Sequence, residues 1–169
     1  MRKLLGIATL AGTLLIAGPA HAGGKERVVV DRFTDRYEFA IDCADFGAYE
    51  FENLVSGVQR VRVVEVSDKE GRLLQTVFHS TLRETNTNSV TGDSIALSGA
   101  VHEVWDYAAD TRTLNGKVWM GQRPGDGVLF QDTGRITMTL GTRDATFIAG
   151  PHDVFENGLD PLVCAALAG

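Results

Sequence analysis

The chain has 169 residues, of which 22 are acidic and 16 are lysine or arginine, so its formal net charge is −6. This acidic balance is a poor match for nucleic-acid backbones and anionic lipid, which attract clusters of Lys and Arg, and we expect no nucleic-acid partner. The only hint of a basic patch is the set Arg60, Arg62 and Arg72, whose alternating strand positions favour an ordinary solvated face.

Residues 1–22 predict export. They comprise two basic residues near the start, an apolar run over residues 4–17, and small residues at the two positions that a signal peptidase reads. The apolar run is short for a membrane span, so we expect no stable membrane anchor after cleavage. Cleavage leaves residues 23–169 as a single secreted or periplasmic domain, with 14 basic and 22 acidic residues and a formal charge of −8.

Between Asp31 and Gly150, apolar residues recur mostly at every second position, and clusters of Gly, Asn, Asp and Pro interrupt the alternation. This pattern is typical of short strands joined by turns. We expect strands over residues 36–43, 49–55, 59–66, 72–83, 95–107, 114–120, 128–132, 135–140 and 145–149, with a bend at Thr133-Gly134 between the seventh and eighth segments. Residues 84–93 are polar without a hydrophobic period, and they predict the longest loop.

About eight consecutive strands with short connections predict an all-β fold, a small antiparallel up-and-down barrel. A two-sheet β-sandwich is the alternative, because strand number alone does not separate the two architectures. After the last strand, residues 159–167 predict one or two helical turns that carry Cys164.

The predicted domain holds two cysteines, Cys43 near its start and Cys164 near its end. In an oxidising compartment the two are expected to form a disulfide. A bond that encloses most of the domain contributes about 5 kcal/mol in the loop-entropy model. The alternative is a redox or nucleophilic thiol, but the sequence has no Cys-x-x-Cys and no basic neighbour that would lower a thiol pKa.

Two carboxylates are the first candidates for chemistry. Glu103 and Asp132 fall by parity on the apolar faces of their strands, where a barrel would bury them. A buried carboxylate takes up a proton or finds a partner, which is how general acids are tuned, and Glu103 is the candidate catalytic residue. The alternative is a structural ion pair with Arg135 or Arg62, or a position beside water at a barrel mouth.

Aromatic side chains would fill the barrel or line a cavity within it. Small residues at Gly99 and Gly116 leave room for a ligand. The predicted ligand-binding residues are Glu103, Trp105, Phe130 and Asp132.

No cofactor or metal site is predicted. The three histidines of the domain, His79, His102 and His152, have no chelating spacing, and surface or structural roles are favoured. His152 is the one most suited to a structural hydrogen bond. The sequence also lacks a serine-hydrolase elbow and a phosphate-binding loop.

The second half of the domain resembles a group of small secreted bacterial proteins without assigned function. The resemblance rests on residues 87–94, 114–118, 127–136, 149–153 and 164–167. It implies a calycin-like barrel, similar in outline to lipocalins and to the allene oxide cyclase barrel, and it transfers no catalytic residue. Its motif positions are Asp132, Gly134, Arg135, His152 and the two cysteines, and a bend held by an Asp132–Arg135 pair would explain the first three.

Two functions follow as hypotheses. The first is a non-enzymatic barrel that binds a small apolar or amphipathic ligand, or an extracellular protein, through its mouth and the 84–93 segment. The second is an isomerase or cyclase of the allene oxide cyclase type, which would confine its substrate beside a buried carboxylate such as Glu103. Binding is favoured, because no nucleophile, base and oxyanion donor occur together.

Overall fold

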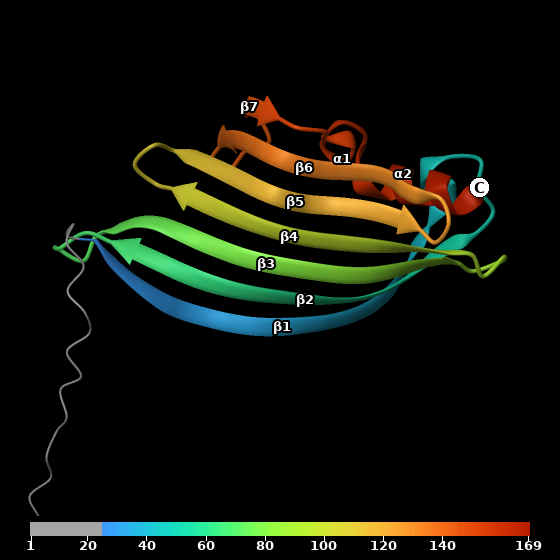
Figure 1. The fold of residues 1–169 in the computed structure, drawn as a ribbon, viewed down its shortest axis with the longest axis horizontal. Helices are drawn as coiled ribbons and strands as arrows, with labels where there is room; N and C mark the ends of the chain where they lie inside the picture. Colours follow the sequence, from blue (N-terminus) through green and yellow to red (C-terminus); the bar gives the residue numbers. More distant parts are fainter. Residues whose placement is uncertain (1–24) are drawn as a thin grey trace, which may run out of the picture.

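The computed structural model describes residues 25–169, so the predicted signal peptide lies outside the described residues. Seven antiparallel strands form one sheet in chain order (Figure 1). They are β1 (Glu26–Asp42), β2 (Glu52–Ser67), β3 (Leu73–Asn88), β4 (Ser94–Asp106), β5 (Thr111–Arg123), β6 (Gly127–Thr139) and β7 (Ala145–Ala149). The all-β, up-and-down architecture predicted from the sequence is therefore confirmed. The sheet itself is open, with β1 and β7 as its two edges.

Residues 25–169 form seven strands because two pairs of predicted strands each form one continuous strand. The segments at 49–55 and 59–66 form one strand, β2, whose residues 56–58 stay paired with residues 36–38 of β1. Gly57 permits this pairing, because the ring of Tyr37 lies where a side chain would begin, 2.6 Å from an added Cβ. The two segments around Thr133-Gly134 are likewise one strand, β6.

The predicted loop at 84–93 is largely wrong. Strand β3 continues to Asn88, and only a short turn separates it from β4 at Ser94. The polar residues continue the alternation of β3, and Asn86 and Asn88 are buried. The side chain of Asn88 donates to the carbonyl of Leu167 and accepts from the backbone at Val90 and Thr91. Buried amides that find such partners can occupy strand positions normally filled by apolar residues.

Two helices and a short 3-10 helix complete the fold. Helix α1 (Asp153–Asn157) lies against β6, helix α2 (Leu159–Ala168) contacts β3, β4 and η1, and the 3-10 helix η1 (Cys43–Phe46) follows β1 (Figure 1). The predicted helical tail is thus confirmed. None of the helices in residues 25–169 is long and apolar enough to cross a membrane.

The disulfide predicted from the two cysteines is confirmed. Cys43 in η1 and Cys164 in α2 are bonded, both are fully buried, and their Cα atoms are 5.6 Å apart. The bond fastens the helical tail to the end of β1. It therefore links the first and last parts of the described fold across the intervening strands.

The sheet has two chemically different faces. We call the face under the helices the inner face, and its main core cluster consists of Ile95, Leu97, Phe130, Val154, Val163 and Leu167. A second inner cluster packs Leu114, Ile136 and Met138 against Phe155 of α1. The opposite, outer face carries Arg62, His79 and His102, because strand neighbours alternate in direction. Most of the core therefore lies where the helices cover the sheet, and a smaller cluster of Val64, Val66 and Val77 is buried on the outer face.

Candidate functional site

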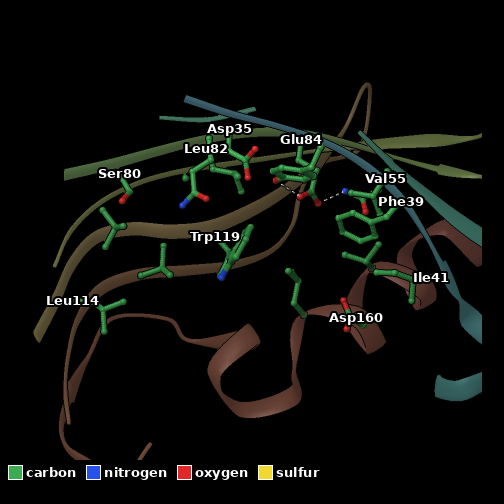
Figure 2. A pocket seen from close by; sticks show the side chains of 18 of the residues that line it. Asp35, Phe39, Ile41, Val55, Ser80, Leu82, Glu84, Leu114, Trp119 and Asp160 are labelled. Carbon is green, nitrogen blue, oxygen red and sulfur yellow. Dashed lines mark hydrogen bonds between the residues drawn. The ribbon is translucent and has the colours of Figure 1, made fainter. Parts of the chain in front are cut away.

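The inner face encloses a cavity of about 600 Å³ between strands β1–β5 and helix α2 (Figure 2). Residues from both β1 and β5 line it, so the sheet curls around this space. We call it the inner cavity.

One part of the inner cavity is apolar. Its aliphatic and aromatic lining comprises Phe39, Ile41, Val55, Leu82, Leu114, Val118 and Trp119 from the sheet, with Leu159 and Val163 from α2. Val55 and Val163 are buried, whereas Phe39 is 50% exposed. The cavity therefore deepens towards α2 and opens to solvent along β1.

A chain of hydrogen bonds crosses the polar part of the cavity. The hydroxyl of Tyr37 donates to Glu84 Oε2 over 2.7 Å, and Asn86 Nδ2 donates to Glu84 Oε1 over 2.7 Å (Figure 2). Asn53 Nδ2 in turn donates to Asn86 Oδ1 over 2.7 Å. Burial and the hydrogen bond to Glu84 raise the pKa of Tyr37. The phenol therefore stays protonated with its hydrogen committed to Glu84, and its oxygen can only accept from a ligand.

Glu103 occupies a second polar position in the cavity. One of its oxygens, Oε1, accepts from Arg112 Nε over 2.6 Å and also from the indole of Trp105. The side chains of Glu103 and Arg112 are 15% and 35% exposed. The carboxylate is therefore held in an ion pair, as the structural interpretation predicted, but with an arginine from β5 instead of Arg62 or Arg135.

The lining of the inner cavity is acidic. Its charged residues are Asp35, Glu84, Glu103, Arg112 and Asp160. Four carboxylates thus share the space with one guanidinium. Such a lining favours a ligand group that is cationic or donates hydrogen bonds.

Asp132 has a different role from the predicted one. Its carboxylate accepts from the backbone N–H groups of Val154, over 2.8 Å, and Phe155, over 3.1 Å, and so caps helix α1. Burial raises the pKa of this carboxyl, and the two N–H donors oppose the shift. The expected Asp132–Arg135 pair is wrong, because Arg135 points to the outer face and lies over the ring of Phe147 at 5.6 Å.

The four predicted ligand-binding residues do not form one site. Glu103 lines the inner cavity, and Trp105 contacts it only through its hydrogen bond to Glu103. Phe130 packs in the main core under α2, and Asp132 holds α1. Sequence reasoning missed Tyr37, Glu84, Asn86 and Arg112. The parity of Tyr37 with Phe39, and of Glu84 with Leu82, was the signal that could have found them.

The histidines and glycines occupy structural or surface positions. His152 is buried at the start of α1, and its Nε2 lies 3.1 Å from the carbonyl oxygen of Ala149. His79 and His102 face each other on the outer face, with ring centroids 4.8 Å apart. Gly99 lines the inner cavity, where an added Cβ would meet the carbonyl of Val118 at 2.5 Å. Within residues 25–169 no group of three or more His, Cys, Asp or Glu side chains is arranged to hold a metal ion.

No protein-family model, curated protein or solved structure matches this chain.

Proposed function

We propose that the protein binds a small amphipathic molecule in the inner cavity and does not transform it chemically. The observation that carries the proposal is a space of about 600 Å³ in which an apolar lining and an acidic, hydrogen-bonded lining face each other. Ligand sites in proteins typically have volumes of about 300–1,000 Å³, mostly apolar walls and a few placed polar groups.

The polar groups specify the kind of ligand. Glu84 accepts from two protein donors, and Tyr37 presents only acceptor lone pairs once its hydrogen is committed. With four carboxylates against one guanidinium, the polar end of the ligand is expected to be an ammonium or another group rich in N–H or O–H donors. Its apolar end would lie against Leu82, Leu114 and Trp119.

The first experiment is native mass spectrometry of the protein from its own host, with organic extraction of bound material. A stoichiometric amphiphile with a cationic or hydrogen-bond-donating head is the expected result. An empty protein that also fails to take up such amphiphiles in a fluorescence-displacement assay would contradict the proposal.

Two variants locate the binding. Leu82→Trp fills the apolar part and is expected to abolish uptake, whereas Val90→Trp, in the exposed turn after β3, leaves it unchanged. Glu84→Gln preserves the shape and is expected to weaken binding of a cationic amphiphile about tenfold, because it removes one charge. Its matched control is Glu38→Gln, an exposed glutamate of β1 on the outer face.

An isomerase of the allene oxide cyclase type is the second candidate, and one observation favours it: Glu103 lines the inner cavity with its carboxylate held in place. Ligand binding without chemical conversion is preferred, because Arg112 and Trp105 already donate to Oε1 of Glu103. Glu103→Gln separates the two candidates. Turnover lost while ligand retention persists would favour the isomerase.

We also propose that the protein is exported and that its sheet forms most of a calycin-like barrel. The disulfide supports export, since such bonds persist in oxidising compartments. The seven up-and-down strands support the barrel.

Mass analysis of the protein from its host tests export, with Gly23 as the expected first residue. Hydrogen exchange at β1 tests closure, because a closed barrel protects both edges of that strand.

A further inference from the structure

The outer face places basic side chains in line across the sheet. Six residues pair in register on six consecutive strands, namely Arg32, Arg62, His79, His102, Asn115 and Arg135. We call them the cross-strand row. Cross-strand neighbours lie about 4.8 Å apart in the hydrogen-bonding direction, so the row presents closely spaced donors from β1 to β6.

A parallel row extends this positive surface. One step further along the strands, Arg60 on β2 and Lys117 on β5 occupy the same face, with Thr and Ala at the other positions. Neither row contains a carboxylate, although the chain as a whole is acidic. The three ion pairs formed within residues 25–169 involve Arg72, Arg112 and Arg123, none of which lies in either row. Arg72 belongs to the β2–β3 turn and pairs with Asp68.

The arrangement is unfavourable for the isolated protein. Arg32 lies directly opposite Arg62, and His79 lies directly opposite His102. Like charges at directly opposed positions destabilise a sheet. Burial, His102, Arg62 and Arg27 all lower the pKa of His79. A bound polyanion would remove this repulsion. An ordinary solvated face gives no reason for the placement of like charges opposite one another.

The surface is an open groove and not a closed pocket. An open groove of about 830 Å³ runs along the cross-strand row and is bordered by Arg60 and Thr81. Neither row contains Phe, Tyr or Trp, and the ring of Phe147 beyond the end of the cross-strand row has Arg135 over it. The row itself therefore offers no series of aromatic rings on which nucleic-acid bases could stack. Because the sheet curls around the inner cavity, this face is the convex one, and a planar bilayer would meet it over a narrow strip. A flexible chain can follow the curvature.

We propose that the outer face binds a linear acidic polysaccharide, whose carboxylate or sulfate groups lie along the cross-strand row. The polymer crosses the strands and is held by charge-assisted hydrogen bonds from arginine and lysine. This binding is independent of the inner cavity, which opens on the other face of the sheet.

The test measures binding of two probes, size-defined heparin and oligogalacturonate, by isothermal titration calorimetry at several salt concentrations. Affinity is expected to fall steeply with salt, because binding releases counterions. The double variant Arg32→Gln/Arg62→Gln is expected to lose at least about tenfold in affinity and part of the salt dependence. Arg72→Gln, on the turn, is the matched control and should bind like the unchanged protein.

Folding and competing ligands are checked in the same series. Without polymer, the double variant is expected to melt at the same or a higher temperature, because it removes opposed charges. Absence of salt-dependent binding to both polysaccharides would overturn the proposal, as would equal losses in the Arg72→Gln control. Tighter binding to single-stranded DNA, or to vesicles of phosphatidylglycerol and phosphatidylcholine, would overturn the choice of a polysaccharide.

The pH dependence of the affinity for the polymer provides a second test. His79 faces Arg62 on β2 and His102 on β4, and the row continues to Arg32 on β1 and Asn115 on β5. His79 has a pKa lowered by burial and by its charged neighbours His102, Arg62 and Arg27, and its protonation in acid adds positive charge to the row. Affinity for the polymer should therefore rise as the pH falls. His79→Gln/His102→Gln should abolish this rise, and its persistence in that variant would show that the row is not the site.

Discussion

Strand β1 and the strands β4–β6 differ sharply in how they are held. Strand β1 is the longest of the sheet, with 17 residues, yet none of its residues is buried. The shorter strands β4–β6 supply Ile95, Leu97, Phe130 and Ile136, which pack under the helices. Length and backbone pairing therefore do not make a strand part of the core. The strand that lacks a core is also the one that borders the opening of the inner cavity.

The largest effect is expected from the bond that fastens the end of β1. Replacing Cys43 and Cys164 together by Ser should lower the free energy of unfolding by about 5 kcal/mol, because the bond closes nearly the whole described fold. Urea denaturation measures the loss. Reductant should destabilise the unchanged protein to the same extent and leave the double variant unaffected. Equal stability of the two proteins would show that the helices hold β1 without the bond.

The same substitution at two phenylalanines tests the contrast directly. Phe130→Ala should cost about 4 kcal/mol, because Phe130 is buried among the residues under α2. Phe39→Ala, on β1, should cost less than about 1 kcal/mol, because half of that residue is already exposed. Thermal and urea unfolding measure both. Similar costs at the two positions would mean that β1 belongs to the same packed core.

The hydrogen bond between β1 and β3 is expected to contribute less to stability than the disulfide or Phe130. Tyr37→Phe removes the hydrogen bond to Glu84 and should cost about 1 kcal/mol. Amide exchange should accelerate in β1 more than in β5, because Tyr37 is one of the few side chains that tie β1 to the sheet. Asn115→Ala, on β5, serves as the comparison. Uniform acceleration across the sheet would argue against a separately held edge.

A pH-dependent effect on stability is expected on the inner face, where Asp132 holds α1. The pKa of Asp132 is raised by burial, so the folded state binds its proton more tightly than the unfolded state does. This group therefore favours folding at low pH, and its contribution is lost as the pH rises through the raised pKa. Asp132→Asn should be about 1 kcal/mol less stable in acid, and the gap should narrow towards neutral pH. A gap that widens with pH would reverse the assignment.

Sequence reasoning succeeded where one periodicity persisted. The alternation over residues 72–83 predicted which side chains of β3 share a face, and the two cysteines predicted their own bond. The loop prediction for 84–93 failed because Glu84, Asn86 and Asn88 find hydrogen-bond partners in the folded protein. Polarity alone could not reveal those partners, since they come from β1, β2 and α2.

The functional residues were harder to predict for a related reason. Parity placed Glu103 and Asp132 on the inner side, but it could not say which would face the cavity and which would cap a helix formed 20 or so residues later. The partner of Glu103 depends on the β4–β5 register, which brings Arg112 opposite Trp105. The net charge was equally uninformative about the outer face, because the acidic residues are concentrated elsewhere.

The position of the disulfide also bears on the strand that borders the inner cavity. The bond fixes the distal end of β1 to α2, so the two cannot separate there while it is intact. The remainder of β1 has no buried residue and one neighbouring strand, β2. The disulfide therefore constrains one end of the strand that borders the cavity and leaves its N-terminal part to the pairing with β2 alone.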